Sequence, residues 1–206
     1  MLKTVKISFA YDCLSPWVIK DCSVEFKSPS VCLINGGNGS GKSTFMEMMT
    51  GFKRPVSGDV IINNVNLYAS NKAVSSLRRI ISYMPASVRM PLYLDVSYML
   101  KLWMGGFFKD ELVSSLGLSH FMGHKYHSLS DGYRNRVHLA IALSRGAFVM
   151  LDEPLKSQDD ELKELFPELI QKYSAGRTFI VTSPNIIEGV NWDKKFVLSR
   201  GALNES

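Results

Sequence analysis

The sequence lacks any long apolar run. No window of about 18 residues, the length that crosses a bilayer as a helix, is free of charged side chains. The first residues, MLKTVKISFAYD, contain no apolar segment as long as that of a signal peptide. We therefore expect a cytosolic chain, or one that lies on a membrane without crossing it.

Cysteine is also scarce. The three cysteines, Cys13, Cys22 and Cys32, are odd in number and show neither a CxxC motif nor a Cys/His zinc spacing. This count excludes a disulfide framework of the kind that small secreted domains use. We expect the three thiols to be reduced and to behave as small hydrophobic side chains in a reducing compartment.

Charge of either sign is moderate. Charged residues make up 21% of the 206 residues and hydrophobic residues 46%, which excludes the composition of a disordered chain. The net charge of +5 suits an anionic partner such as a nucleotide, a phospholipid surface or an RNA, but it is too small to indicate nucleic acid. The chain contains no repeat, low-complexity tract or linker, so we expect residues 1–206 to form a single domain.

Short apolar runs alternate with stretches that are compatible with helix. Such interleaving is typical of an α/β fold with a mainly parallel sheet. The runs predict strands at Val5–Phe9, Val31–Asn35, Val60–Ile62, Ile80–Met84, Phe148–Leu151, Thr178–Thr182 and Phe196–Ser199. Between about residues 86 and 143 the alternation stops, which predicts a helical insertion with helices at Val96–Met104, Lys109–Leu116 and Tyr133–Leu143.

Residues 36–44 read GGNGSGKST and match the phosphate-binding pattern G-x-x-x-x-G-K-[ST] at every fixed position. The segment follows a predicted strand and leads into a predicted helix, Thr44–Thr50, where backbone N–H groups can surround a polyphosphate. Lys42 is expected to reach the β- and γ-phosphates and Ser43 to ligate Mg²⁺. A plain Gly/Ser-rich turn is the alternative. The predicted nucleotide contacts are Gly36, Gly37, Asn38, Gly39, Ser40, Gly41, Lys42, Ser43 and Thr44.

Two acids follow the apolar run Phe148–Leu151. A phosphate loop of this type needs a metal-binding carboxylate at the end of another buried strand, and Asp152 is placed to supply it. The next residue, Glu153, is expected to orient or deprotonate the attacking water, so Glu153 and Lys42 are the predicted catalytic residues. A pair of solvated carboxylates at a strand end is the alternative.

The segment Leu129-Ser130-Asp131-Gly132-Tyr133 precedes an apolar helix and then the strand that ends at Asp152. It resembles the LSGGQ signature of ABC-type ATPases, and its place in the chain is the order of that family. With GGNGSGKST and FVMLDEP, the whole chain resembles the nucleotide-binding subunit of an ABC transporter. The pattern Gly51-x3-Pro55-x2-Gly58 resembles the turn that enters the family's antiparallel β subdomain.

The resemblance implies a fold, substrates and partners. The fold is an α/β P-loop NTPase core with a small antiparallel β portion and a helical insertion. Ser130 and Gly132 would contact the ATP of a second cassette, either a copy or a homologue, so that two subunits enclose two nucleotides. Tyr11 would stack on adenine, with Phe9 and Trp17 as rival candidates and an ordinary strand-end aromatic as the alternative.

Several positions depart from the family pattern. Ala86 replaces a glutamine that contacts Mg²⁺ and water, and Ser183 replaces a histidine that contacts the γ-phosphate. In the signature, Asp131 replaces a glycine and Tyr133 a glutamine; the loop Leu155-Lys156-Ser157-Gln158-Asp159 is atypical but keeps its interface aspartate. We expect binding of ATP with Mg²⁺ and slow or partner-dependent hydrolysis, because such groups typically contribute about 10²–10⁴ in rate.

Two other segments allow two interpretations each. His120, His124 and His127 are spaced as three metal ligands on one helix face would be, or they belong to a solvated connector. The apolar stretch Met90–Phe108 is either core of the helical insertion or the surface that, in the resembled family, docks the coupling helices of a membrane subunit.

The sequence thus predicts the ATP-binding and hydrolysing subunit of an ABC transporter, peripheral at the cytoplasmic face of the membrane and without nucleic acid. A separate transmembrane permease subunit would carry the substrate, and the compact chain favours export. One alternative is an ATP-gated regulatory subunit with little activity. Another is a soluble relative that acts on DNA or ribosomes, which usually needs tandem domains or a coiled-coil insertion for which 206 residues leave no room.

Overall fold

A computed structural model describes residues 1–88, 90–157 and 159–206. Arg89, inside the predicted helical insertion, and Gln158, in the loop before Asp159, lie outside the described residues. The central sheet has the strand order β10-β9-β3-β8-β7-β6, and all its neighbouring pairs are parallel except β10 with β9. Its strands are β3 (Ser30–Asn35), β6 (Ile81–Met84), β7 (Phe148–Asp152), β8 (Thr178–Ser183), β9 (Lys194–Ser199) and β10 (Ala202–Glu205).

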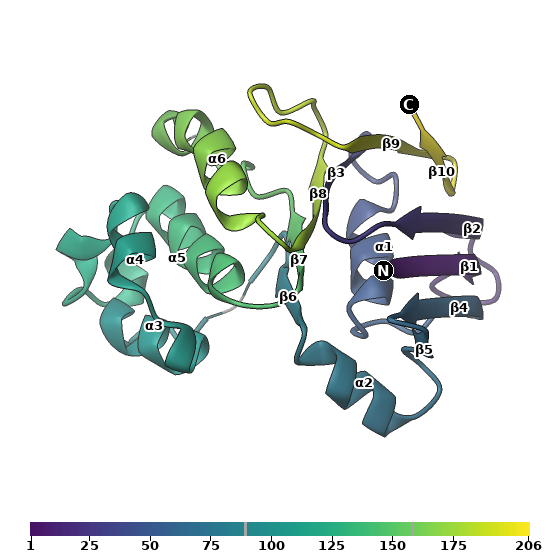
Figure 1. The fold of residues 1–206 in the computed structure, drawn as a ribbon, viewed down its shortest axis with the longest axis horizontal. Helices are drawn as coiled ribbons and strands as arrows, with labels where there is room; N and C mark the ends of the chain where they lie inside the picture. The colour runs from purple at the N-terminus through teal and green to yellow at the C-terminus, as the bar shows by residue number, and fades with distance from the viewer. Residues whose placement is uncertain (89, 158) are drawn as a thin grey trace.

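A second, antiparallel sheet lies at the right of Figure 1 with the order β2-β1-β4-β5. Its strands are β1 (Leu2–Phe9), β2 (Ile19–Phe26), β4 (Ser57–Ile62) and β5 (Val65–Asn66). The pairing of β1 with β4 shifts register between Val5 and Ser8, and Gly58 lies opposite this shift with a positive φ of 82°. The sequence did not predict β2, because its residues IKDCSVEF carry charges and no regular apolar alternation.

Six α-helices complete the described part of the chain. They are α1 (Lys42–Met49), α2 (Asn71–Arg78), α3 (Val96–Met104), α4 (Asp110–Ser115), α5 (Asp131–Ser144) and α6 (Asp160–Tyr173). Between β6 and β7 the described residues form helices and short 3-10 turns but no strand, and α3, α4 and α5 gather at the left of Figure 1. The predicted α/β fold, with a small antiparallel portion and a helical insertion, is confirmed.

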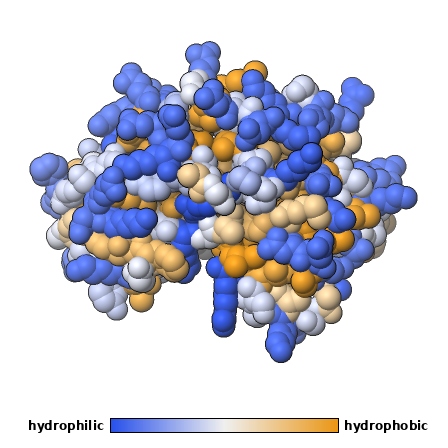
Figure 2. All heavy atoms as spheres, viewed as in Figure 1, coloured by the Kyte–Doolittle hydropathy of each residue, from blue (hydrophilic) through white to orange (hydrophobic). Residues whose placement is uncertain are grey.

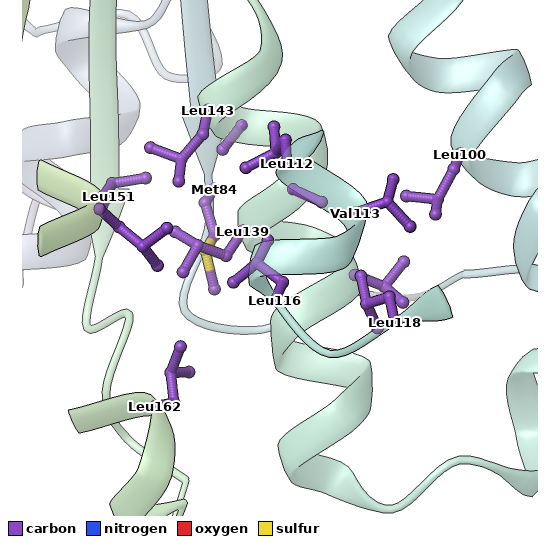
Figure 3. Close-up of a cluster of buried hydrophobic side chains, with 14 of the residues drawn as sticks. Met84, Leu100, Leu112, Val113, Leu116, Leu118, Leu139, Leu143, Leu151 and Leu162 are labelled. Carbon is purple, nitrogen blue, oxygen red and sulfur yellow. The ribbon is translucent and has the colours of Figure 1, made fainter. Parts of the chain in front are cut away.

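Strands β3, β7 and β8 of the central sheet are buried on both faces, and their successive side chains point to opposite sides. In β7, Phe148 and Met150 pack toward α1 and the antiparallel sheet, whereas Val149 and Leu151 pack toward α5 and α6. Figure 3 shows Leu151 and Met84 of the sheet meeting Leu139 of α5. The strand ends between these two packed layers are therefore held in fixed positions.

The three cysteines differ in their exposure to solvent. Cys22 and Cys32 are buried, and burial raises the pKa of Cys22 to about 11. Cys13 is exposed in the connection between β1 and β2, so it does not serve there as a hydrophobic side chain of the core. Among the described helices, none has the length and hydrophobicity needed to cross a bilayer.

Candidate functional site

The loop from residue 36 to 41 joins the end of β3 to the start of α1. Gly39 and Gly41 have φ values of 78° and 99°, which L-residues with side chains rarely adopt. A Cβ on Gly41 would also lie 3.0 Å from Cγ1 of Val18. Glycine at these positions therefore lets the backbone curve around the positive end of α1, where N–H groups are free to bind an anion.

Lys42 is the first residue of α1 and its side chain is almost fully buried. Its ammonium donates to the carbonyl oxygens of Gly36 at 2.8 Å and Gly37 at 3.1 Å. It also lies 3.1 Å from Oε1 of Glu153, at the end of β7. The two predicted catalytic residues thus form an ion pair across the loop, a contact that the sequence alone did not predict.

The two acids after β7 are positioned by one residue of the neighbouring strand. The hydroxyl of Thr182 donates to Oδ1 of Asp152 at 2.6 Å and accepts a hydrogen bond from the backbone N–H of Glu153 at 3.0 Å. Asp152 is 1% exposed, and within residues 1–88, 90–157 and 159–206 its Oδ2 has no hydrogen-bond partner. A buried carboxylate oxygen without a partner suits a hard cation such as Mg²⁺.

A cavity of about 460 Å³ lies at the phosphate loop. Its lining includes Tyr11, Val18, Asn38, Gly39, Gly41, Lys42, Ser43, Thr44 and Glu153. The structure therefore brings most of the predicted nucleotide contacts together with the predicted base. Of the three aromatic candidates, Tyr11 lines this cavity, whereas Phe9 is buried and Trp17 is not among the lining residues.

Three predicted loop residues, Gly36, Gly37 and Ser40, are not among the residues that line this cavity. Gly36 is buried, and a Cβ there would lie 2.7 Å from the carbonyl oxygen of Leu198 and from Oγ of Ser40. Gly37 offers its carbonyl to Lys42. Thr44 uses its hydroxyl for Tyr11, since the two oxygens are 3.0 Å apart.

Ser183 is the last residue of β8 and lies beside Asn35 of β3, the residue before the phosphate loop. Its hydroxyl accepts a hydrogen bond from the N–H of Asn185 at 3.2 Å, so it closes its own turn. It lines a separate cavity of about 320 Å³ that also includes Glu153. The hydroxyl of serine is too short to extend from there in the way that a histidine ring does.

Ser130 and Gly132 lie in a different cavity, of about 640 Å³. Ser130 is the N-cap of α5, and its hydroxyl accepts from the N–H of Tyr133 at 3.4 Å. Neither residue lines the cavity at Lys42. Within one chain, the predicted signature and the phosphate loop are thus two separate surfaces.

An ion-pair network lines the cavity that contains Ser130 and Gly132. Arg136 of α5 is 3% exposed and holds Asp159 in a bidentate pair, with N–O distances of 2.7 Å and 2.7 Å. A third bond of 2.8 Å joins Arg136 to Glu161, and the guanidinium holds the pKa of Asp159 below its usual value of 3.8. A Cβ on Gly132 would lie 3.0 Å from Oδ2 of Asp159, so any larger residue there would crowd this carboxylate.

The three spaced histidines do not share a helix face. His120 and His127 belong to separate 3-10 turns, Ser119–Phe121 and Tyr126–Ser128, and all three rings are exposed. In the part of the chain that the structure describes, no group of three or more His, Cys, Asp or Glu side chains is arranged to hold a metal ion.

The fourth histidine, His138 of α5, is partly buried and was not among the predicted site residues. Its Nε2 lies 2.7 Å from the hydroxyl of Tyr126, and burial lowers its pKa to about 4. The ring lines two adjoining cavities of about 680 and 490 Å³. Because only tertiary packing buries this position, no local sequence signal identifies it.

The apolar stretch Met90–Phe108 has a buried face and an exposed face. Met99 and Leu100 of α3 belong to the core, while Tyr98 and Leu102 are each 56% exposed. Figure 2 shows apolar atoms at the lower left, where Figure 1 places α3, and a hollow beside them toward the antiparallel sheet. A core helix thus leaves an apolar face uncovered.

The fold and the loop define the chain as a P-loop nucleotide-binding protein. A family profile described as "ABC transporter" matches residues 19–156. The chain belongs to the ABC transporter family of ATP-binding cassettes, which are ATPases.

Named relatives differ in function. The chain is 29% identical over 203 residues to the human ATP-binding cassette sub-family A member 13, covering 90% of this chain and 4% of that protein. It is 28% identical over 196 residues to the Fe(3+) ions import ATP-binding protein FbpC of Pseudomonas fluorescens, covering 90% and 55%. It is 26% identical over 200 residues to the lipoprotein-releasing system ATP-binding protein LolD of Colwellia psychrerythraea, covering 90% and 78%. The chain thus spans about half of one relative and a small part of another.

Solved structures share the fold. A dimeric ATP-binding cassette in a post-hydrolysis state, bound to ADP and Pi, superposes with a TM-score of 0.88 at 21% identity, over 100% of this chain and 98% of that one. A bacterial Atm1-family ABC exporter with ATP bound superposes with a TM-score of 0.86 at 20% identity, over 98% and 37%.

Proposed function

We propose that residues 1–206 form one ATP-binding domain that hydrolyses ATP and thereby drives a separate transmembrane permease. The observation that carries this proposal is that Lys42, Ser43 and Glu153 line one cavity at the start of α1. Phosphate-binding N–H groups, a lysine and a carboxylate then surround the same space. This arrangement suits the transfer of a terminal phosphoryl group to water.

Binding of ATP would exchange the partners of Lys42. Its ammonium now satisfies two loop carbonyls and Glu153. A triphosphate carries more negative charge than these groups, so Lys42 would turn to the β- and γ-phosphates. Asn38, Gly39 and Gly41 would supply backbone N–H groups, and Tyr11 would stack against the base.

Asp152 and Ser43 would hold Mg²⁺. Oδ1 of Asp152 is fixed by Thr182 and its buried Oδ2 is free for a cation or for a water bound to it. When bound, Mg²⁺ neutralises charge on the phosphate oxygens. The residues present thus fit a resident divalent cation between Ser43, which lines the cavity, and Asp152, which ends β7.

Once Lys42 turns away, Glu153 is free to accept a proton from the attacking water. Ala86 offers no polar atom to that water, and Ser183 is bonded within its own turn. We therefore propose slow hydrolysis, or hydrolysis that depends on a partner. An ATP-gated regulatory subunit with little activity is the second candidate, favoured by the same two residues.

A second cassette would complete each site. Ser130 and Gly132 lie at the positive end of α5, in a cavity apart from Lys42, where they would contact the γ-phosphate of ATP held by a copy of this chain or a homologue. A dimeric cassette with the same fold supports this proposal.

The membrane subunit would dock on the uncovered face of α3, beside Tyr98 and Leu102. The chain would then be peripheral at the cytoplasmic face and would not need nucleic acid for its positive charge. We propose export as the direction. The named relatives do not decide it, because they include an Fe(3+) import protein and a lipoprotein-releasing protein.

The test is ATP turnover with and without vesicles that hold the copurifying membrane protein. We expect turnover to rise at least tenfold with the permease and to vanish in Glu153→Gln. ATP binding without turnover in either condition would support the regulatory subunit instead. Transport assays in vesicles of both orientations then test the direction.

A further inference from the structure

One basic side chain outside the phosphate loop touches the ring of Tyr11. Lys53 lies in the turn after α1, and its ammonium is 4.5 Å from the centroid of the Tyr11 ring. The same ammonium donates to the Tyr11 hydroxyl at 3.4 Å and pairs with Oε2 of Glu47 at 2.9 Å. Lys53 therefore connects the aromatic ring to α1, the helix that begins with Lys42.

Burial does not hold the Tyr11 ring, because 64% of this residue is exposed. Three directed contacts hold it instead. Its hydroxyl lies 3.0 Å from Oγ1 of Thr44, Lys53 lies over one face, and Phe9 meets it edge to face at a centroid distance of 5.2 Å. The surrounding connection between β1 and β2 has no regular secondary structure.

We propose that Lys53 is a positioning residue that fixes Tyr11 with one face covered by the ammonium and the opposite face open to the nucleobase. This inference rests on the proposed function, since it takes an adenine nucleotide as the ligand. Lys53 itself touches neither base nor phosphate in this assignment. It acts through the orientation of the ring.

The physical reason is preorganisation. A tyrosine on an irregular connection loses conformational freedom when it stacks on a base, and that loss weakens binding. The cation–π contact and the hydrogen bonds restrict the ring before the nucleotide arrives. The ammonium also draws π-electron density toward the covered face, which favours stacking of an electron-rich purine on the other face.

Glu47 makes this arrangement possible at neutral pH. Burial alone lowers the pKa of Lys53, but the hydrogen bond and charge of Glu47, with the bond to Tyr11, outweigh it and raise that pKa. Lys53 therefore stays protonated. Since Glu47 largely neutralises it, its net attraction for phosphate is small.

The experiment compares two ligands that differ in the base. Affinities for ATP and for inorganic tripolyphosphate are measured by calorimetry on the full chain. We expect Lys53→Met to weaken ATP binding roughly 3- to 10-fold and tripolyphosphate binding less than about twofold. Lys53→Arg keeps a cation over the ring and should stay within about twofold of the parent for both ligands. Lys72→Met, an exposed lysine on α2, is the matched control.

A double-variant cycle tests whether Lys53 acts on ATP affinity through the ring of Tyr11. In a Tyr11→Ala background, Lys53→Met should cause no further loss of ATP affinity, because no ring is left to position. Equal losses for ATP and tripolyphosphate would show that Lys53 attracts phosphate and would overturn the proposal. An undiminished effect of Lys53→Met in the Tyr11→Ala background would overturn it as well.

Tyr11→Phe gives a second route if Lys53→Met does not fold. It keeps the ring but removes the hydroxyl that contacts Lys53 and Thr44, and it should weaken ATP binding without affecting tripolyphosphate. Retention of full ATP affinity by Tyr11→Phe in that case would contradict the proposal. Failure of the proposed function has a different signature, namely that the parent chain binds tripolyphosphate and ATP equally weakly.

Discussion

The ammonium of Lys42 lies 3.1 Å from the Oε1 atom of Glu153. Each of these residues has a separate proposed task, yet here each neutralises the other. Glu153 also has a φ of +50°, which is uncommon for a residue with a side chain and fixes its carboxylate direction at the strand end. Binding of a polyphosphate would therefore do two things at once: it would recruit the lysine and release the carboxylate.

The first prediction concerns Glu153→Gln. The amide cannot accept a proton, so we expect turnover to fall by about 10²–10⁴. ATP affinity should stay equal or increase, because Lys42 no longer has an anionic competitor. Steady-state turnover and ATP titration measure the two effects.

Glu164→Gln changes an exposed glutamate of α6 and should alter neither quantity. Loss of ATP affinity in Glu153→Gln, with turnover retained, would mean that Glu153 organises the loop and does not act as a base.

The second prediction compares two adjacent aspartates. Asp159→Asn keeps the helix cap, since asparagine also caps helices, but removes the charge beside buried Arg136. We expect a loss of about 3 kcal/mol in unfolding free energy, the low end for a broken buried pair because Glu161 remains. Asp160→Asn breaks only an exposed pair with Lys163 and should cost less than about 1 kcal/mol. Urea denaturation of both variants at pH 7 measures the difference.

The pH dependence of this pair follows from the lowered pKa of Asp159. Its stabilisation is complete above the usual aspartate value of 3.8 and is lost as the pH falls through the lower value of the folded protein. The parent chain should therefore lose this contribution only in strong acid. The difference in stability between parent and Asp159→Asn should be constant from pH 7 to 5 and shrink below about pH 4. A difference that already shrinks near pH 6 would contradict this origin.

The third prediction concerns His138. Burial lowers its pKa to about 4, against about 6.5 in an unfolded chain, so the folded state disfavours the protonated ring. Stability should be complete above pH 6.5 and fall by up to about 3 kcal/mol as the pH approaches 4. His138→Gln should remove most of this slope, whereas exposed His120→Gln should retain it. Urea midpoints at pH 7, 5.5 and 4.5 provide the measurement.

The fourth prediction separates steric contact from backbone strain. Gly58 and Gly176 both have positive φ, but a Cβ on Gly58 would lie 2.3 Å from the carbonyl oxygen of Lys6, whereas one on Gly176 meets nothing within 4 Å. Gly176→Ala should cost about 1 kcal/mol from strain alone. Gly58→Ala should cost at least about 2 kcal/mol more, since β1 must move. Thermal unfolding of both variants tests this order.

The sequence predicted those parts of the fold that consist of buried, uninterrupted apolar runs. The strand Phe148–Leu151 is one, and the acids after it were recognisable because a buried strand must end at the sheet edge. Strand β2 escaped prediction because its pairing with β1 comes from tertiary contacts and its residues carry charges. Local pattern therefore reveals the central sheet better than the antiparallel one.

The candidate site also has a part that the sequence could predict and a part that it could not. The phosphate loop is contiguous in sequence, so its residues could be named in advance. The pairing of Lys42 with Glu153, of Arg136 with Asp159 and of Lys53 with Tyr11 joins segments far apart in the chain, which only the folded structure brings together. Ser183 could be named in advance as well, but the hydrogen bond that its hydroxyl accepts from the N–H of Asn185 is seen only in the folded structure.

The two side-chain hydrogen bonds of Thr182 limit which residues can replace it. Its hydroxyl donates to Asp152 and accepts from the N–H of Glu153, which also reaches the backbone carbonyl of Thr182 at 3.2 Å. Valine has the same shape but neither capacity, and serine has both. Serine at this position would therefore keep both side-chain bonds, whereas valine would leave Oδ1 of Asp152 without the donor that fixes it. A lineage that has lost turnover would be free to place valine there, which makes residue 182 a marker of catalytic decay in chains of this kind.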